Sequence, residues 1–255
     1  MIYYILPAYN EELNIISLLN KFNNHFENEN YNYKPQVIII DDGSNDKTKA
    51  ILNKLNEEKQ IFNKKFKFEL ISIFHERNMG LGEAIKSGMM YCFENGSNGD
   101  IIVTMDCDNS HTVEQSREMI EVIKSGKDIV IASRYRKNSD THGLSNLRKL
   151  LSYFGCIIFK IAFPIKHVKD YTCGFRAFKL EKIKEAFDLN KNFFSEKGFT
   201  ASVDIILKLN KFNKSLLFEE IPMILRYDLK QGKSKIKIVK TIFMTLFLLF
   251  RRRFF

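Results

Sequence analysis

The chain has 255 residues, of which 45% are hydrophobic and 27% are charged. This composition is typical of globular proteins and excludes a disordered or fibrous chain, and the length fits one large domain or one domain with a short appendage. The net charge of +10 is concentrated near the C-terminus, where residues 205–255 carry twelve Lys and Arg against three acidic residues. A basic excess at one end indicates an anionic partner, either nucleic acid or membrane phosphate.

Apolar runs alternate with stretches of helical spacing over the first 135 residues. Continuous apolar strands separated by helices predict an α/β fold, with a mostly parallel central sheet flanked by helices. In such sheets ligands bind beyond the carboxyl ends of the strands, so the functional residues should follow the strands directly. The predicted strands are residues 2–6, 37–40, 68–74, 101–105 and 129–132, and the predicted helices are residues 13–26, 48–55, 84–93 and 113–123.

Two segments near the N-terminus follow predicted strands and carry polar residues. In LPAYNEE, Pro7 ends the strand and leaves Tyr9 and Glu11 at the crevice, where a ring beside a carboxylate suits a base and a ribose. An ordinary turn before a helix is the stronger explanation for this segment alone. In IIIDDGSNDKT, Asp42 could hold a ribose diol or a base edge, and the alternative is that Asp41 or Ser44 caps the next helix.

The segment IIVTMDCDNSH is the most informative. Asp106 and Asp108 lie two residues apart after an apolar strand, so both carboxylates can point into one crevice. Carboxylates with open coordination positions suit Mg²⁺ or Mn²⁺, which complete their shell with diphosphate and water, and Ser110 could add an oxygen. The alternative is a turn with two solvated aspartates. The strand-end position, together with DDGS on another strand, favours a metal site.

Arginines follow the fifth predicted strand. In VIASRYR, Arg134 can bind phosphate oxygens with its guanidinium group. Arg148 and Ser152 lie four residues apart and share one face of a predicted helix, although Arg148 could also be a solvated helix residue. NMGLGEA, at residues 78–84, lacks the full pattern of a phosphate loop and predicts only a turn and a helix start.

The C-terminal part is more apolar and more basic. Residues 172–178 are a candidate strand, residues 181–187 and 200–209 are candidate helices, and another strand should end at residues 222–225. The ten apolar residues 241–250 are too few to span a bilayer. Flanked by Lys and by three arginines at 251–253, they predict an amphipathic helix at the membrane interface, beside anionic headgroups. A core-packing helix is the alternative, and residues 150–163 could be a second interfacial helix.

The cysteines and the N-terminal sequence give information on the cellular compartment of the protein. None of the four cysteines belongs to a CxxC pair, which argues against disulfides and structural zinc. No charged segment precedes an apolar run at the N-terminus, so no signal peptide is expected. We expect reduced thiols and a cytoplasmic protein. Nucleic acid is not an expected partner, because the aromatic residues gather in the apolar run instead of alternating with basic residues.

The motifs LPAYNEE, DDGSNDKT, NMGLGEAIKSG, MDCDNSH, ASRY and DYTCGFRAF, in this order, resemble the family-two inverting glycosyltransferases of the GT-A fold. Within that family the chain looks most similar to the dolichol-phosphate mannose synthases and related polyprenyl-phosphate glycosyltransferases. The resemblance covers residues 1–235 and leaves residues 236–255 as a membrane-associating helix. One departure from the family pattern is RYDLKQGKSK, at residues 226–235. The stretch of this segment that precedes the GxSK end motif is longer than expected.

The resemblance assigns roles to the residues singled out above. It implies a metal site at Asp106 and Asp108, with Ser110 where some members have a glutamine ligand. It implies that phosphate is held by Arg134, Arg148 and Ser152. Together with Asp108, these three are the expected catalytic residues. The nucleotide sugar is expected to contact Pro7, Tyr9, Glu11, Asp42 and Asp106.

The implied reaction is the transfer of mannose or glucose from GDP-mannose or UDP-glucose to a polyprenyl or dolichyl phosphate. It would require a metal ion, invert the anomeric configuration and take place on the cytosolic face of the membrane, with or without a membrane-anchoring partner. A phosphate acceptor is already an anion at neutral pH and needs no general base. An acceptor hydroxyl of a lipid-linked saccharide or surface polysaccharide would need one, with Asp170 and Asp204 as candidates. A catalytically dead membrane-bound scaffold is the third alternative.

Overall fold

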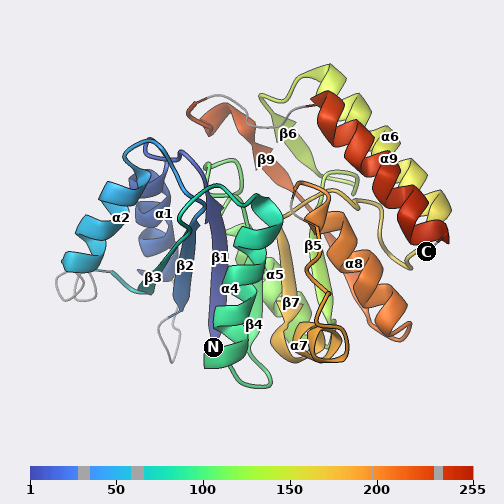
Figure 1. Cartoon of the computed structure of the whole chain (residues 1–255), viewed down its shortest axis with the longest axis horizontal. Helices are drawn as coiled ribbons and strands as arrows, with labels where there is room; N and C mark the ends of the chain where they lie inside the picture. Colours follow the sequence, from blue (N-terminus) through green and yellow to red (C-terminus); the bar gives the residue numbers. More distant parts are fainter. Residues whose placement is uncertain (28–34, 59–65, 197, 233–237, 255) are drawn as a thin grey trace.

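The computed structural model describes residues 1–27, 35–58, 66–196, 198–232 and 238–254. Its core is a seven-stranded sheet with helices on both faces (Figure 1). Along the sheet the strand order is β3 (Glu69–Phe74), β2 (Gln36–Asp41), β1 (Ile2–Ala8), β4 (Ile101–Thr104), β7 (Arg176–Lys179), β5 (Ile129–Ser133) and β8 (Phe218–Pro222). The predicted α/β architecture is therefore confirmed.

The apolar runs form parallel strands because both faces of the sheet are covered. β1 pairs in parallel with β2 and β4, and β5 pairs in parallel with β8. The helices around them are α1 (Ile15–Glu27), α2 (Thr48–Glu57), α4 (Leu81–Asn95), α5 (Gln115–Lys124), α7 (Leu180–Leu189) and α8 (Ala201–Phe212).

Close packing of α4 on the sheet depends on a glycine. A Cβ atom at Gly88 would lie 2.6 Å from Cγ2 of Ile5 on β1, well inside van der Waals contact. With glycine at this position, the helix can approach the strand closely. The first turn of α4 is thereby held beside the carboxyl end of the sheet, next to the polar loops described below (Figure 1).

β7 differs from the strand predicted at residues 172–178. It begins only at Arg176, and it runs antiparallel to both neighbours, β4 and β5. The reason is local: the carboxylate of Asp170 accepts hydrogen bonds from the backbone N–H groups of Thr172 (3.2 Å) and Cys173 (3.1 Å). These bonds hold residues 170–173 in a loop, so the strand begins later than predicted.

The strand predicted to end at residues 222–225 is two strands. After β8, the backbone N–H of Met223 donates to the carbonyl of Ser133 (3.0 Å), and the chain continues as β9 (Ile224–Arg226). β9 pairs in parallel with β6 (Asp140–His142) in a second, two-stranded sheet and leads into the 3₁₀ helix η1 (Tyr227–Leu229). This small sheet lies above the carboxyl end of the main sheet (Figure 1).

Helices α6 (Asn146–Ala162) and α9 (Ile238–Phe254) pack side by side at one edge of the molecule (Figure 1). Their exposed apolar side chains form what we call the α6–α9 apolar surface. Among the described helices, none is long and apolar enough to cross a membrane. The α6–α9 apolar surface consists of Leu147, Leu150, Tyr153, Phe154, Ile158, Ile161, Phe243, Leu246, Phe247 and Phe250, each at least 43% exposed.

The arginines at the end of α9 do not all face outward as expected. Arg251 forms an ion pair with Glu196, and Arg252 binds both oxygens of Asp204 on α8, at 2.7 and 3.0 Å. Asp204 is buried, and a buried carboxylate requires a counter-charge. Two of the three arginines thus anchor α9 to the domain, and only Arg253 is exposed. The predicted boundary at residues 235 and 236 and residues 233–235 of the GKSK segment lie outside the described residues.

Candidate active site

The DDGS segment forms a tight turn at the end of β2. Gly43 has a φ of +67°, and a Cβ atom there would lie 2.3 Å from the backbone of Arg77. Asp42 is buried against the loop after β3, where it accepts hydrogen bonds from the backbone N–H groups of Met79 and Gly80, both at 2.8 Å. Nδ1 of His75 lies 2.7 Å from the same carboxylate. Asp42 therefore holds the two loops together in the structure.

The PAYNEE segment lies beside this turn. Tyr9 is half-buried, and its hydroxyl accepts a hydrogen bond of 3.4 Å from Nδ2 of Asn45. Glu11 is buried, and its Oε2 accepts a hydrogen bond of 2.7 Å from Nδ2 of Asn14. The prediction that Pro7 ends the strand is wrong, because β1 continues to Ala8 and Pro7 lies opposite Ile40 in the pairing with β2. These residues are gathered at the carboxyl end of β1 and β2, as predicted, while Glu11 points toward Asn14.

Asn14 connects three segments of the site. Besides Glu11, its Nδ2 donates to the carbonyl of Gln231 (3.1 Å), and its backbone carbonyl accepts from Nδ2 of Asn109 (3.2 Å). Asn109 directly follows Asp108 in the chain and has a left-handed φ of 64°. One side chain thus ties the nucleotide-side loop to the aspartate loop and to the segment after η1.

Asp106 and Asp108 lie together in the loop after β4 but differ in their surroundings. The side chain of Asp106 is 51% exposed and faces a cavity. Asp108 is buried: its Oδ1 accepts a hydrogen bond of 2.5 Å from Oγ of Ser110, and its Oδ2 forms an ion pair with Lys230. The two carboxylates are therefore near one another, with Asp106 open and Asp108 covered.

The surroundings act on the pKa values of these groups in opposite directions. Partial withdrawal from water raises the pKa of Asp106, and the charge of Asp108 adds to this effect. Burial alone would also raise the pKa of Asp108, but the charge and hydrogen bond of Lys230, with the hydrogen bond of Ser110, lower it. In turn, Asp108 raises the pKa of Lys230. Asp108 is therefore an anion paired with a cation at neutral pH.

His111 supports the aspartate loop. Its Nδ1 accepts a hydrogen bond of 3.0 Å from the backbone N–H of Asp106, which requires the proton of a neutral ring to be on Nε2. The ring stacks on Phe175, with centroids 4.9 Å apart and planes inclined by 13°. Nε2 lies 3.8 Å from Oδ2 of Asp106. His111 therefore orients Asp106.

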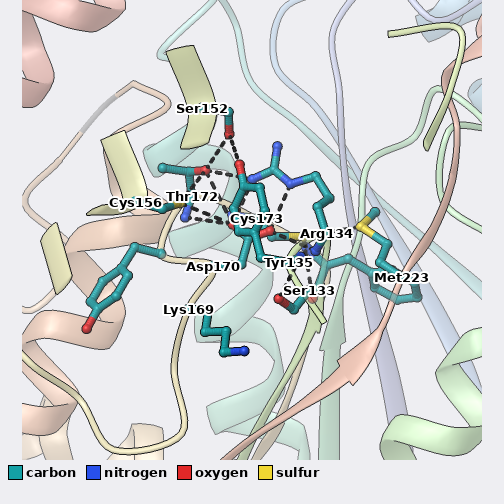
Figure 2. Close-up of polar contacts among 12 residues, drawn as sticks. Ser133, Arg134, Tyr135, Ser152, Cys156, Lys169, Asp170, Thr172, Cys173 and Met223 are labelled. Carbon is teal, nitrogen blue, oxygen red and sulfur yellow. Dashed lines mark hydrogen bonds and ion pairs between the residues drawn. The ribbon is translucent and has the colours of Figure 1, made fainter. Parts of the chain in front are cut away.

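Arg134 is held by a buried aspartate. Its Nε and Nη2 donate to the two oxygens of Asp170 at 2.8 and 2.7 Å, and Nη2 also donates to Oγ1 of Thr172 at 2.6 Å. Figure 2 shows the Asp170 carboxylate at the centre of these contacts. Burial would raise the pKa of Asp170, but Arg134 and the hydrogen bonds around it lower this pKa. Among the described residues, Nη1 of Arg134 has no hydrogen-bond partner, so it can bind a ligand.

Arg148 and Ser152 lie on the same face of α6, as their spacing predicts. Oγ of Ser152 accepts a hydrogen bond of 2.9 Å from the hydroxyl of Tyr135 and lies 3.2 Å from Oγ1 of Thr172. Nη1 of Arg148 donates to the hydroxyl of Tyr227 at 2.8 Å. These contacts connect α6 to the turn after β5, to the loop before β7 and to η1.

A cavity of about 410 Å³ brings most of these residues together. Its polar end lies between the aspartate loop and the arginines, and its apolar end lies between α6, α8 and α9. The polar wall consists of Asp106, Ser110, His111, Arg134, Arg148, Ser152 and Thr172. The apolar wall includes Leu151, Phe154, Ile158, Phe199, Val203, Leu225 and Leu246.

The donor set at Asp106 and Asp108 fits Mg²⁺ or Mn²⁺. Among the described residues, no group of three or more His, Cys, Asp or Glu side chains forms a complete metal cage. A carboxylate that faces a cavity, with a second carboxylate buried behind it, nevertheless suits a hard cation that takes its other ligands from water and phosphate. Lys230 already places a positive charge on Asp108, which shows that this position accepts a cation.

The two candidate bases are engaged elsewhere. Asp170 is fully buried against Arg134, and Asp204 is bound by Lys208 (2.8 Å) and Arg252 (2.7 Å). Both are therefore structural, and neither can take a proton from an acceptor hydroxyl.

Sequence reasoning missed Asn14, His75, Tyr227 and Lys230. Asn14 immediately follows PAYNEEL, so its closeness to a motif was a usable signal. Lys230 and Tyr227 belong to a segment that is more than 115 residues from the aspartate loop, and only the path of β8, β9 and η1 brings them there.

Comparison with known proteins agrees with this geometry. The sequence profile of glycosyl transferase family 2 matches residues 3–187. The chain is 33% identical over 240 residues to the dolichol-phosphate mannosyltransferase of Pyrococcus furiosus, covering 94% of this chain and 60% of that protein. It is 31% identical over 219 residues to the UDP-N-acetylglucosamine–dolichyl-phosphate N-acetylglucosaminyltransferase of Methanococcus voltae, covering 84% of this chain and 82% of that protein. The chain thus spans about three fifths of the length of the first relative.

Among solved structures, the glucosyl-3-phosphoglycerate synthase of Mycobacterium tuberculosis, crystallised with Mn²⁺, UDP and glucosyl-3-phosphoglycerate, is similar in fold. The TM-score is 0.66 at 16% identity, over 99% of this chain and 80% of that chain. The likeness shows that the sheet and its helices form a GT-A fold. Because the family profile matches most of the chain, and because the two relatives are more than 30% identical, this chain belongs to glycosyl transferase family 2.

Proposed function

We propose that this chain transfers a sugar, mannose or glucose, from a nucleotide sugar to the phosphate of a polyprenyl or dolichyl lipid, with inversion at the anomeric carbon. An oxygen of the acceptor phosphate forms a bond to the anomeric carbon while the bond from that carbon to the diphosphate breaks. The nucleoside diphosphate leaves, so that one displacement inverts the configuration. The relatives named above, whose names specify dolichol or dolichyl phosphate, support this acceptor class.

The lining of the cavity is the observation that carries the proposal. Among the described residues that line it, Asp106 is the single carboxylate, and Arg134 and Arg148 supply positive charge across the same space. An anionic acceptor suits such a wall, while a hydroxyl acceptor would need a carboxylate base in addition to Asp106, which is assigned to the metal ion. The cavity then continues between apolar side chains of α6 and α9, which suits a lipid chain.

On the donor side, Asp106 and Asp108, with Ser110, would hold Mg²⁺ or Mn²⁺. The ion would supply electrostatic stabilisation of the leaving diphosphate. The loops at Pro7, Tyr9, Glu11 and Asp42 would position the base and ribose of GDP-mannose or UDP-glucose. The hydrogen bonds that already join these loops would keep them ordered, which reduces the entropy lost when the donor binds.

On the acceptor side, Arg134, Arg148 and Ser152 would hold the phosphate. The free Nη1 of Arg134 can donate to one phosphate oxygen while Asp170 fixes the other edge of the guanidinium group. A phosphate monoester has a second pKa of about 6 and is already nucleophilic at neutral pH. These residues therefore orient and neutralise the acceptor, and no proton transfer is required of them.

We propose that the chain acts at the cytosolic face of the membrane, with the α6–α9 apolar surface in the interface. Phe243 is 72% exposed and Ile161 is 78% exposed, although both are large apolar side chains. Contiguous apolar side chains on a helix pair suit the boundary between headgroups and acyl chains. Arg253, which is exposed, would lie beside anionic headgroups. A separate membrane-anchoring partner is compatible with this arrangement.

The test is a transfer assay with the full chain, GDP-mannose or UDP-glucose, Mn²⁺ and polyprenyl phosphate in vesicles. We expect a lipid product whose sugar is released by mild acid, as for a glycosyl phosphate. Asp108→Asn should lower the transfer rate about a thousandfold, which corresponds to about 4 kcal/mol of transition-state stabilisation. Asp188→Asn, at an exposed site on α7, is the matched control and should keep the parent rate.

Two outcomes would contradict the proposal. An acid-stable product would show that the acceptor is a hydroxyl group. Absence of transfer with every donor by the parent chain, with vesicle binding intact, would support a scaffold without catalytic activity.

A further inference from the structure

Lys230 covers the more buried of the two predicted metal ligands. Its ammonium group forms an ion pair with Oδ2 of Asp108, and the side chains are only 11% and 8% exposed. Oδ1 of the same carboxylate accepts hydrogen bonds from Oγ (2.5 Å) and the backbone N–H (3.1 Å) of Ser110. Both oxygens of Asp108 are therefore engaged within the chain.

The segment that carries Lys230 is fixed on both sides. The backbone N–H of Gln231 donates to Oδ1 of Asn14 (3.3 Å), and its carbonyl accepts from Nδ2 of Asn14 (3.1 Å). On the other side, the ammonium of Lys230 lies 5.4 Å from the centroid of the Tyr227 ring. The guanidinium of Arg148 lies 5.8 Å from that same ring. The lysine is thus held against Asp108 by contacts with the donor side and with the acceptor side.

We propose that Lys230 is a tethered cation that occupies the metal position at Asp108 until a divalent ion, bound together with a nucleotide diphosphate, displaces it. The inference rests on the proposed function, because it requires a metal at Asp106 and Asp108. A divalent ion and an ammonium group cannot approach the same carboxylate oxygen, since their charges repel each other. The metal must therefore displace the lysine.

The displaced lysine explains why metal and nucleotide should bind together. Without nucleotide, the released ammonium would remain in a mostly buried position without its anion, which is costly. A diphosphate brings negative charge to the same place and offers the ammonium a new partner. Each ligand therefore raises the affinity for the other, and this coupling is reciprocal.

The experiment measures Mn²⁺ affinity of the full chain from the electron paramagnetic resonance signal of free Mn²⁺, with and without UDP or GDP. In the parent we expect nucleotide to tighten Mn²⁺ binding at least tenfold. In Lys230→Met, Mn²⁺ alone should bind about tenfold more tightly than to the parent, and nucleotide should add less. Lys124→Met, which removes an exposed lysine on α5, is the charge-matched control and should behave as the parent does.

Two further variants keep the result interpretable. Lys230→Arg retains a cation and should keep the weak metal binding of the parent, so an equal gain in the Arg and Met variants would overturn the inference. Asp108→Asn should lose Mn²⁺ binding in all conditions. If Asp108→Asn loses Mn²⁺ binding and Lys230→Met shows no gain in Mn²⁺ affinity, the inference about Lys230 is wrong, while the proposed metal site is supported. If Asp108→Asn binds Mn²⁺ as the parent does, the proposed metal site itself is wrong, and the inference fails with it.

Discussion

The two sides of the cavity are built differently. On the donor side, polar groups are paired with one another: Asp42 accepts three hydrogen bonds from the loop that follows β3, and Asn14 joins three segments. On the acceptor side, α6 has only Cys156 and Phe159 fully buried, and its outer face is apolar and exposed. The donor side is thus ordered by the domain itself, whereas the acceptor side has an apolar surface that the domain does not cover.

This difference indicates which interactions stabilise each side of the cavity. The donor loops are stabilised by hydrogen bonds between neighbouring loops at the carboxyl end of the sheet. Helix α6 is attached to the sheet through a polar cluster, in which Ser152 and Cys156 contact Thr172 and Tyr135 around the Arg134–Asp170 ion pair (Figure 2). That ion pair is therefore the link between the two sides, and substitutions there should separate them most clearly.

The largest effect is expected from Asp170→Asn. It leaves the Arg134 guanidinium without its anion in a buried position, which should cost about 3–5 kcal/mol of folding free energy. For a domain of this size, this corresponds to a decrease in Tm of roughly 10 °C. Thermal unfolding followed by circular dichroism at pH 7 measures it, with Asp188→Asn as the exposed control. A decrease in Tm equal to that of the control would show that the ion pair does not join the two sides.

The same variant has a predicted dependence on pH. The folded state lowers the pKa of Asp170 below its unfolded value of about 3.9. The carboxylate therefore contributes its stability above pH 4, and this contribution is lost as the pH falls through the folded pKa. The difference in Tm between the parent and Asp170→Asn should be constant from pH 5 to pH 7 and should shrink below pH 4. A difference that grows on acidification would contradict this assignment.

A smaller effect is expected from Arg148→Ala on the acceptor side. Arg148 lines the cavity, and the loss of one charge-assisted hydrogen bond to phosphate should raise the KM for the lipid phosphate about tenfold. The KM for the nucleotide sugar should change much less. Lys149→Ala removes the neighbouring exposed charge and is the control. An equal rise in the KM for the lipid phosphate in both variants would mean that Arg148 acts only through general attraction to an anionic surface.

The smallest effect is expected from Phe247→Ser on the α6–α9 apolar surface. Phe247 is 56% exposed, so its transfer from water into the interface should be worth about 1 kcal/mol, or about fivefold in vesicle affinity. Sedimentation with phosphatidylglycerol-containing vesicles measures it. Leu189→Ser, at a 76% exposed leucine on α7, is the matched control. Equal vesicle binding by the parent and Phe247→Ser would place the membrane contact elsewhere.

Much of the donor side could be predicted from the sequence. Continuous apolar runs predict buried parallel strands, and the residues after such strands must meet at one edge, because parallel strands end together. This reasoning placed Asp42, Asp106 and Arg134 at the carboxyl end of the sheet, and the spacing of Arg148 and Ser152 placed them on one helix face. These features are local, so periodicity and strand-end position were sufficient to find them.

Only the tertiary structure decided how these residues are paired. The contact of Lys230 with Asp108 and the contact of Arg252 with Asp204 join residues 122 and 48 positions apart. The antiparallel direction of β7 and the loop that Asp170 organises before it are features that no pattern of apolar residues reveals. Charge and periodicity describe what each segment can do by itself, whereas the partner of a buried charge depends on where the folded chain brings a distant segment.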